Sequence, residues 1–329
     1  MEKILITGAS GFIGGFLVEE ALNRGLDVYA GIRKSSSKEF LSDPRINFCY
    51  MDFRDTDHLS DLLTTHQFDY VIHNAGLTQA KTEEALMEVN AEYLNNLLTA
   101  VAQSDNELKK FSFMSSLASY GPADFQPKGI VDHESVPNPV TKYGRSKLKG
   151  EEYLKSTKDI PWVILRPTAV YGPREHELLT VFKSINSGIE AKIGFAPQKL
   201  SFIYVYDLAR ITLDTLLQSD AGSEYFVGDG EIYEVTEFNR YIREALGKKT
   251  LKLSIPVPIM SGIALLYESI SKVTGNYPIV NLDKMNEIKA KSWQIDTNNL
   301  LKDINFVPRF LLEDGIKDTV RWYKENNWI

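Results

Sequence analysis

The stretch Thr7-Gly8-Ala9-Ser10-Gly11-Phe12-Ile13-Gly14 joins a short apolar run to a helical pattern, and it decides the fold. Residues 4–7 predict a buried strand, because Ile4, Leu5 and Ile6 are consecutive apolar residues, and residues 12–24 predict a helix. The glycines therefore lie at a strand-to-helix turn, where backbone N–H groups and the positive end of a helix dipole face a pyrophosphate. Glycines also serve ordinary loops, but this position favours a dinucleotide site. The cofactor contacts predicted here are Gly8, Ser10, Gly11, Phe12, Ile13 and Gly14.

Strands and helices alternate through the first half of the chain. Strands are predicted at residues 4–7, 27–32, 46–51, 70–73, 110–114 and 162–166, and helices at 12–24, 56–66, 82–104 and 140–157. Alternation of this kind predicts a doubly wound α/β fold of the Rossmann type, with a parallel sheet covered by helices on both faces.

The regularity ends after Arg166, where prolines and glycines separate shorter elements. We expect a strand at 201–205 and helices at 207–218, 238–246, 256–273 and 311–326. The predicted division is a dinucleotide-binding domain over 1–166, to which residues 201–230 contribute late strands, and a smaller, interleaved substrate-binding portion over 167–329.

Composition narrows the class of protein. Of 329 residues, 43% are hydrophobic and 25% charged, which is ordinary globular usage. The net charge of −7 gives no support for nucleic-acid binding, and a single cysteine, Cys49, excludes an intramolecular disulfide. No signal peptide precedes the first strand, so we expect a cytoplasmic protein. We also expect a small-molecule substrate and a homodimer.

Residues 255–267 form an apolar stretch that is too short and too interrupted by Pro256, Pro258 and Gly262 to span a bilayer. It predicts a helix that covers a substrate pocket or docks on a partner, or else one buried in the C-terminal portion.

Tyr143 and Lys147 are four residues apart, so they share one face of the helix predicted at 140–157. A free tyrosine has a pKa of about 10 and is a poor base near neutrality. A nearby ammonium favours the phenolate, which gives the YxxxK spacing a mechanism in proton transfer. A surface tyrosine beside a solvated lysine is the alternative interpretation.

Small and polar residues follow several predicted strands, where open α/β sheets bind ligands. Residues 111–114 lead into Ser115 and Ser116, and residues 70–73 lead into Asn74-Ala75-Gly76. After the second strand, Arg33 and Lys34 replace the acidic residue that would accept a ribose 2′-hydroxyl. Two cations suit a 2′-phosphate and favour NADP over NAD.

Taken in order, these motifs resemble the extended short-chain dehydrogenase/reductase family, which contains sugar-nucleotide epimerases and dehydratases, dihydroflavonol reductases and 3β-hydroxysteroid dehydrogenases. The resemblance covers essentially the whole chain, from the glycine turn through SSLASYG (residues 115–121) and YGRSK (143–147) to RPTAVYGP (166–173). It implies a catalytic set of Ser116, Tyr143 and Lys147. It also implies that Asp52 and Phe53 contact the adenine, that Ala75 and Gly76 lie along the cofactor, that Lys147 binds the nicotinamide ribose, and that Pro167 to Ala169 border the nicotinamide. Asn90 matches an asparagine of the family, whereas Tyr93 and Leu94 replace the Gly-Thr of many sugar-nucleotide enzymes.

Other residues favour structural roles. We expect His73 to be a satisfied core histidine, and Trp293 and Trp322 to be packing residues. No histidine spacing suggests a metal site.

The predicted reaction is hydride transfer between NADP(H) and a carbonyl or secondary alcohol, with Tyr143 as acid/base. Thr168 stands where many sugar-nucleotide members of the family carry Asn. The segment Lys199-Leu200-Ser201, directly before Phe202, lacks the arginine that often holds a diphosphate in those members. The cations Arg174, Lys192 and Lys199 remain candidates for that role. The alternative is a nucleotide-diphosphosugar epimerase or dehydratase with tightly bound NAD, and the third hypothesis is a non-catalytic NADP-binding regulator.

Overall fold

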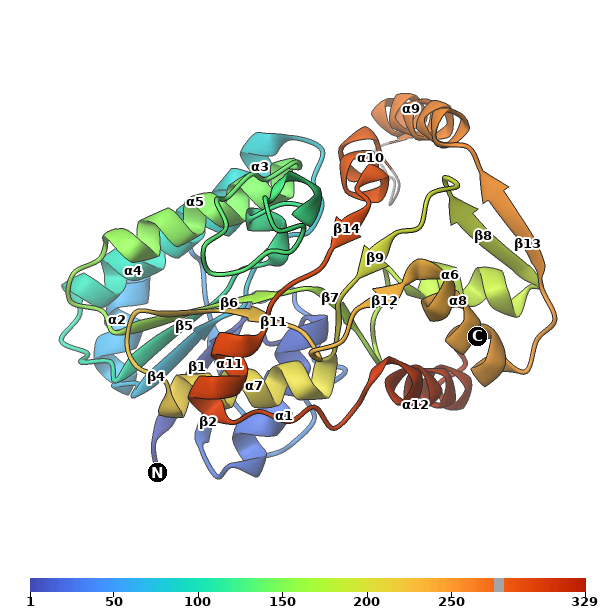
Figure 1. Cartoon of the computed structure of the whole chain (residues 1–329). Helices are drawn as coiled ribbons and strands as arrows, with labels where there is room; N and C mark the ends of the chain where they lie inside the picture. Colours follow the sequence, from blue (N-terminus) through green and yellow to red (C-terminus); the bar gives the residue numbers. More distant parts are fainter. Residues whose placement is uncertain (275–280) are drawn as a thin grey trace.

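The computed structural model describes residues 1–274 and 281–329, without the side chains of 267–274. Its centre is a seven-stranded sheet of order β11-β6-β5-β4-β1-β2-β3, in which all neighbouring strands run parallel (Figure 1). The predicted doubly wound α/β fold is confirmed. The strands are β1 (Lys3–Thr7), β2 (Asp27–Ile32), β3 (Asn47–Tyr50), β4 (Tyr70–His73), β5 (Lys110–Met114), β6 (Trp162–Pro167) and β11 (Ser223–Val227).

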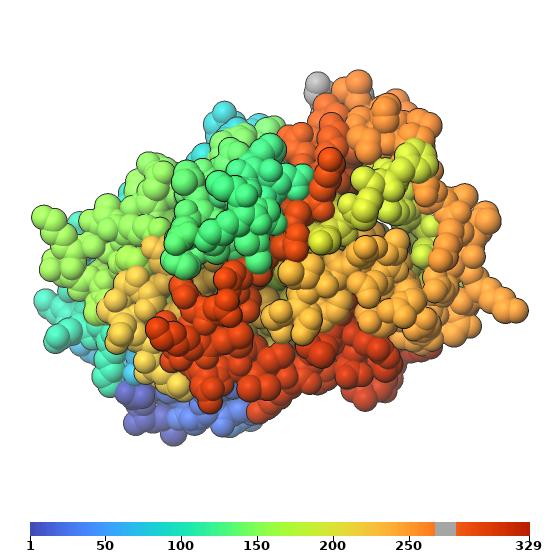
Figure 2. Space-filling model, in the orientation of Figure 1, coloured from blue at the N-terminus to red at the C-terminus, as the bar shows by residue number. Residues whose placement is uncertain are grey.

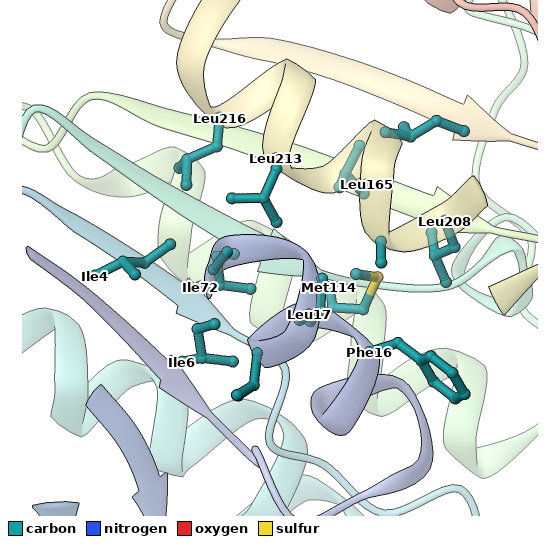
Figure 3. Close-up of a cluster of buried hydrophobic side chains, with 14 of the residues drawn as sticks. Ile4, Ile6, Phe16, Leu17, Ile72, Met114, Leu165, Leu208, Leu213 and Leu216 are labelled. Atoms are coloured by element: carbon teal, nitrogen blue, oxygen red, sulfur yellow. The ribbon is translucent and has the colours of Figure 1, made fainter. Parts of the chain in front are cut away.

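Helices cover both faces of this sheet, which is why its central strands are buried at every position of β4 and β5. On one face lie α1 (Phe12–Asn23), α7 (Val205–Gln218) and α11 (Asn298–Ile304); on the other lie α2 (Thr56–His66), α4 (Tyr93–Gln103) and α5 (Lys142–Ser156). Figure 3 shows Ile4, Ile72 and Leu165 of the sheet packed against leucines of α1 and α7. Each such side chain contributes about 1.5–3 kcal/mol when fully buried.

The predicted helix at 82–104 is interrupted. It consists of α3 (Glu83–Met87), a π-helical turn η1 (Glu88–Glu92) and α4. Asn90 lies in the π turn, where its amide oxygen accepts from Leu77 N (2.8 Å) and its amide nitrogen lies 2.9 Å from both Leu77 O and Ser146 Oγ. The turn thereby connects the loop after β4 to α5, which explains why the helix departs from regular geometry at this point.

The rest of the chain forms short sheets and helices beside the carboxyl ends of the main sheet. The strand predicted at 201–205 is β10 (Phe202–Tyr204), which pairs with β7 (Ala169–Tyr171) rather than with the main sheet. The other strands are β8 (Ile189–Ile193) with β13 (Leu251–Ile255), and β9 (Lys199–Leu200) with β12 (Tyr233–Glu234) and β14 (Ser292–Trp293). The helices are α6 (Leu179–Asn186), α8 (Val235–Leu246), α9 (Val257–Thr274), α10 (Leu282–Lys289) and α12 (Leu312–Glu325), and the 3₁₀ turns are η2 (Leu117–Ser119) and η3 (Ala123–Phe125).

The apolar stretch at 255–267 forms β13's last residue and the first part of α9. Ile259 and Leu266 are 57% and 61% exposed, and the Tyr267 side chain lies outside the described residues. Among the described residues, no helix has the length and apolar character that a membrane crossing needs.

Candidate active site

A cleft of about 530 Å³ opens at the carboxyl ends of the central strands. One wall comes from the sheet and its loops; the other comes from residues 175–178, 198–201 and 281–293. Figure 2 shows how the orange and red C-terminal residues run between the green and yellow surfaces. The cleft therefore lies where ligands bind in open α/β sheets.

The glycine turn lies beside the sheet wall of the cleft. Gly8 has a φ of +66°, which favours glycine, and its carbonyl oxygen accepts from Gly11 N at 3.0 Å. Gly11 is the N-cap of α1 and brings no side chain to cap it, so the first-turn N–H groups stay available to an anion. Phe12 and Ile13 line the cleft directly after this turn. These residues fit the pyrophosphate of a dinucleotide.

Ser116 and Tyr143 both line the cleft, and the Ser116 hydroxyl lowers the pKa of the Tyr143 phenol. Ser116 is the N-cap of η2, and Thr141 is the N-cap of α5, accepting from Gly144 N at 3.1 Å. A Cβ atom on Gly144 would lie 2.2 Å from Ala118 O, so only glycine lets α5 approach η2 this closely. Two caps and one glycine thus bring the serine and the tyrosine together.

Lys147 is buried one turn further along α5, and its Nζ donates to Met114 O at 2.9 Å. Burial lowers the pKa of Lys147 to about 8, although the Glu151 carboxylate opposes this shift. The lysine lies beside Gly76, because a Cβ atom there would be 3.1 Å from Nζ. The ammonium is held at the strand ends, close to the loop after β4.

The pKa of Tyr143 lies above its ordinary value, in contrast to the effect we expected from Lys147. Burial of the phenol is the main cause; the Ser116 hydrogen bond lowers the pKa, and the Glu287 and Glu177 carboxylates raise it. Burial likewise raises the pKa of Glu175 to about 7, although Glu177 N and Leu178 N donate to its carboxylate. On the wall opposite Ser116, Glu177 and Glu287 therefore contribute negative charge, whereas Glu175 takes up a proton near neutral pH.

Comparison with known proteins identifies the kind of fold that carries this cleft. The sequence profile of the NAD dependent epimerase/dehydratase family matches residues 4–235. The chain belongs to this family. Among its relatives are a UDP-glucose 4-epimerase of Vibrio cholerae, 28% identical with 99% of this chain and 97% of the relative covered, and a ceramide reductase of Caulobacter vibrioides, 24% identical over 99% and 96%.

A solved structure shares the fold of the chain over nearly its whole length. The UDP-glucuronic acid 4-epimerase of Bacillus cereus, solved in complex with UDP-glucuronic acid and NAD, superposes with a TM-score of 0.77 at 24% identity and covers 98% of this chain and 99% of its own. Resemblance to the extended short-chain dehydrogenases/reductases is thereby confirmed.

The residues predicted to contact an NAD-type cofactor fall into three groups. Seven of them line the cleft with Ser116: Phe12, Ile13, Gly76, Tyr143, Lys147, Pro167 and Ala169. Gly8, Ser10, Gly11, Gly14 and Ala75 belong to the two loops beside it, and Ala75 N donates to Thr7 Oγ1 at 3.2 Å. Arg33, Lys34, Asp52 and Phe53 lie outside the cleft lining, after β2 and β3.

The outer four residues have different surroundings. Arg33 and Lys34 are exposed, and Arg33 N donates to Ser36 Oγ at 3.2 Å. Asp52 pairs with Arg54 at 2.9 Å, and the Phe53 ring stacks on Tyr93 at 5.7 Å. Tyr93, which departs from the pattern of many sugar-nucleotide members of the family, thus packs against the residue predicted to contact adenine.

Sequence reasoning missed the opposite wall of the cleft. It is lined by polar residues from separate segments: Glu175, Glu177, Gln198, Ser201, Asp283, Lys284 and Glu287. Their spacing carried no signal, because they come together only through tertiary structure. The Asn74-Ala75-Gly76 sequence did point to the Asn74 and Gly76 contacts, and Trp293, expected to be a packing residue, also lines the cleft.

Three cations offered as diphosphate ligands do not line the cleft: Arg174, Lys192 and Lys199. Arg174 instead pairs with Glu19 at 2.8 Å, and its guanidinium lies 4.5 Å from the ring centres of both Phe16 and Phe40. The apolar run 259–266 does not line the cleft either, so it supplies no apolar substrate surface there.

His73 is buried as expected, but only one of its two ring nitrogens has a hydrogen-bond partner among the described residues. Its Nδ1 lies 3.0 Å from Thr7 Oγ1, whereas its Nε2 has no hydrogen-bond partner among the described residues. Burial, reinforced by the Lys147 charge, lowers the pKa of His73 to about 3, so the ring is neutral. The described residues contain no cluster of His, Cys, Asp and Glu that is suited to hold a metal ion.

Proposed function

We propose that this protein uses NAD or NADP to transfer a hydride at a secondary-alcohol carbon of a substrate held in the cleft. The observation that supports this most strongly is that Ser116, Tyr143 and Lys147 line one cleft, which opens beside the glycine turn. Dehydratases, epimerases and reductases of the family all use such a serine, tyrosine and lysine for the proton transfer that accompanies hydride transfer. A non-catalytic regulator does not need these three residues together.

The chain's own residues handle the proton. Tyr143 Oη takes the proton from the substrate hydroxyl during oxidation and returns it during reduction. Ser116 donates to the substrate oxygen and stabilises the negative charge that develops there. Lys147, held by Met114 O, supplies positive charge beneath the site and a donor for a ribose hydroxyl. The nicotinamide ring, when bound, accepts and returns the hydride.

The residues assigned to hold the cofactor follow its length. The glycine turn, with Ser10 and the N-terminus of α1, would bind the pyrophosphate, and Ala75, Gly76 and Pro167 to Ala169 would border the nicotinamide half. Asp52 and Phe53 would contact the adenine. Arg33 and Lys34, exposed after β2, would bind a 2′-phosphate, so NADP remains our proposal for the preferred form even though the Bacillus relative holds NAD.

The relatives favour a nucleotide-diphosphosugar as substrate and epimerisation as the net reaction. In that reaction the substrate is oxidised, turns in the cleft and is reduced on its other face, so no cofactor is consumed. The homodimer remains a prediction.

A second candidate is net reduction of a substrate without a diphosphate, and the cleft itself favours it. The wall facing Ser116 carries four carboxyl groups, Glu175, Glu177, Asp283 and Glu287. Among the described residues that line the cleft, the cations are Lys284 on this wall and Lys147 on the sheet wall. Lys284 Nζ already pairs with Glu287 at 2.6 Å. A diphosphate needs charge-assisted donors, most often arginine, and this wall would repel it.

One panel separates the two candidates. Purified protein is incubated with NAD⁺ and UDP-glucose or UDP-glucuronic acid, and separately with NADPH and neutral ketones, while sugar configuration is followed by NMR and cofactor by absorbance. Epimerised sugar without net NADH supports the first candidate, and NADPH consumption supports the second. No turnover with either panel, together with no binding of NAD⁺ or NADPH by calorimetry, would contradict the proposal.

A further inference from the structure

Glu151 continues the row of active-site residues along α5. Tyr143, Lys147 and Glu151 are spaced by four, so they share one face of the helix. The Glu151 side chain is 1% exposed, and it does not line the cleft. A buried carboxylate next to a proton-transfer site needs an explanation, because burying a charge is costly unless it is fully paired.

The carboxylate of Glu151 holds the segment that carries Ser116. Its Oε1 accepts from Ser115 Oγ at 2.5 Å and from Ser119 Oγ at 2.8 Å, the residues just before Ser116 and three positions after it. Ser119 Oγ also lies 2.8 Å from the Ser116 carbonyl oxygen. Since a carboxylate can only accept, the Ser115 hydroxyl donates to Glu151, and the single hydroxyl proton of Ser119 is shared between Glu151 Oε1 and the Ser116 carbonyl oxygen. This fixes the turn on either side of Ser116.

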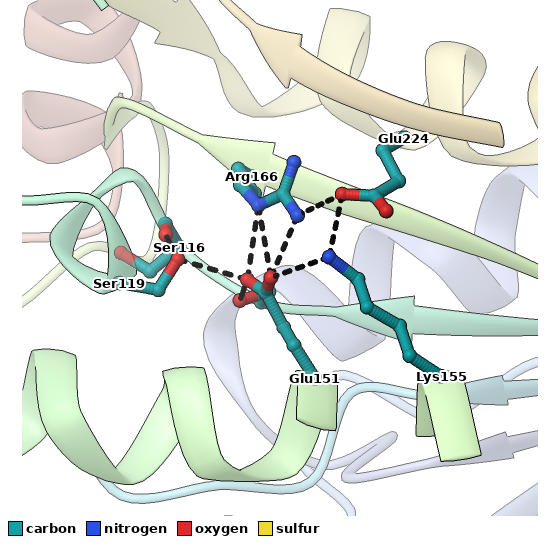
Figure 4. Close-up of polar contacts among 7 residues, drawn as sticks. Ser116, Ser119, Glu151, Lys155, Arg166 and Glu224 are labelled. Carbon is teal, nitrogen blue, oxygen red and sulfur yellow. Dashed lines mark hydrogen bonds and ion pairs between the residues drawn. The ribbon is translucent and has the colours of Figure 1, made fainter. Parts of the chain in front are cut away.

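A second layer of charges surrounds the Glu151 carboxylate (Figure 4). Arg166, on β6, donates to Glu151 through Nε at 3.0 Å and through Nη2 at 2.6 Å. Its Nη2 also pairs with Glu224, whose carboxylate lies 2.8 Å from Lys155 Nζ. The guanidinium is further held 4.5 Å from the ring centre of Tyr120. Two carboxylates and two cations thus balance in charge.

We propose that Glu151 is a positioning residue: it acts through Ser115 and Ser119 to hold the Ser116 hydroxyl against Tyr143. The inference rests on the proposed function, because Glu151 acts only through Ser116, whose role in catalysis is part of that proposal. Glu151 itself contacts neither substrate nor cofactor in this account. One rigid helix then sets all three components, with Tyr143 and Lys147 directly and Ser116 through Glu151. Arg166 pairs with the Glu151 carboxylate directly, and the outer pair of Glu224 and Lys155 contributes to the stability of the fold.

A double-mutant cycle between Ser119→Ala and Ser116→Ala tests this. We expect Ser119→Ala to lower kcat about tenfold, a loss on the order of a well-placed hydrogen bond, while KM for the cofactor stays unchanged. In the Ser116→Ala background, Ser119→Ala is expected to cost less than twofold, because the group that it positions is gone. Equal losses in the two backgrounds would mean that Ser119 acts independently of Ser116 and would overturn the inference.

Two further variants separate positioning from stability. Glu151→Gln replaces one acceptor by a donor, so it should reproduce the kcat loss of Ser119→Ala or exceed it; the serine cycle stands if this variant fails to fold. Lys155→Met removes only the outer cation and should lower the melting temperature while leaving kcat within twofold. A kcat loss in Lys155→Met as large as in Ser119→Ala would overturn the proposal in favour of general destabilisation. Full activity of Tyr143→Phe would contradict the proposed function itself. An inactive Tyr143→Phe variant, combined with equal effects of Ser119→Ala in the wild-type and Ser116→Ala backgrounds, would contradict only this inference.

Discussion

The two walls of the cleft are built in different ways. On the sheet wall, each functional group is fixed by backbone structure: Ser116 by a 3₁₀ N-cap, Tyr143 by a capped helix, and Lys147 by a strand-end carbonyl. On the opposite wall, Glu175 lies in the loop before α6, whereas Asp283 and Glu287 lie on the short helix α10. Asp283 accepts from Lys142 N at 3.1 Å, and Thr141 Oγ1 donates to Glu287 at 3.3 Å, so tertiary contacts with the start of α5 place this helix. The difference suggests a division of labour, in which the sheet wall carries the chemistry and the opposite wall selects the substrate.

The largest expected effect comes from a substitution on the sheet wall. Tyr143→Phe removes one oxygen and leaves the ring, so kcat should fall by about 10²–10⁴, the usual contribution of a general acid or base. Cofactor affinity measured by calorimetry should stay within threefold. Tyr153→Phe is the matched control, because Tyr153 lies on the same helix, outside the cleft lining, and bonds Glu92. Equal activity of the Tyr143→Phe variant and wild type would refute the assignment.

Gly144→Ala tests whether backbone approach positions the sheet wall. The added methyl group would overlap Ala118 O, so we expect a loss of about 2 kcal/mol in the free energy of unfolding and a lower kcat. The control is Gly262→Ala in α9, where, among the described residues outside the helix's own backbone and the two chain neighbours, no atom lies within 4 Å of the added carbon. Helix propensity predicts no loss of stability for this variant. A Gly144→Ala variant as stable and active as wild type would show that α5 and η2 do not need this contact.

The cofactor end of the sheet wall is tested by Arg33→Asp. If Arg33 binds a 2′-phosphate, the variant should lose about tenfold or more in NADP⁺ affinity, because a charge-assisted pair becomes a repulsion, and keep or gain NAD⁺ affinity. Isothermal titration of both cofactors measures this, with the remote and exposed Arg240→Asp as control. Tighter binding of NAD⁺ than NADP⁺ by wild type would overturn the NADP preference.

The smallest effect concerns the influence of the opposite wall on the chemistry. Glu287 raises the pKa of Tyr143, so Glu287→Gln should lower it. Alcohol oxidation needs the phenolate, so its rate rises with pH towards that pKa, and the rising limb should move to lower pH by less than about one unit. The shift is limited because Lys284 already pairs with Glu287. Glu325→Gln, at the far end of α12, should leave the profile unchanged; a shift in the alkaline direction for Glu287→Gln would contradict the electrostatic assignment.

These contrasts also explain what the sequence could predict. The strands at 27–32, 70–73 and 110–114 were predicted with their observed bounds, because continuous apolar runs between turn residues mark buried parallel strands. The π-helical turn at Asn90 was not predicted from the sequence, since it depends on contacts with Leu77 and Ser146 from distant segments. The same holds for the candidate site. Tyr143 and Lys147 follow local spacing, Ser116 follows from the family resemblance, and all three line the cleft. Glu175 and Glu287 are brought to the cleft by tertiary packing alone.

The path of the hydride tests the central proposal most directly. UDP-glucose deuterated at C4 is incubated with the protein and unlabelled cofactor, and the label is located by NMR and mass spectrometry. Hydride transfer predicts deuterium retained at C4 of an epimerised sugar, or, if the cofactor is released, deuterium on the reduced nicotinamide, and no transfer in Tyr143→Phe. Converted product whose C4 deuterium has exchanged into water would contradict hydride transfer, and with it the role given to the sheet wall.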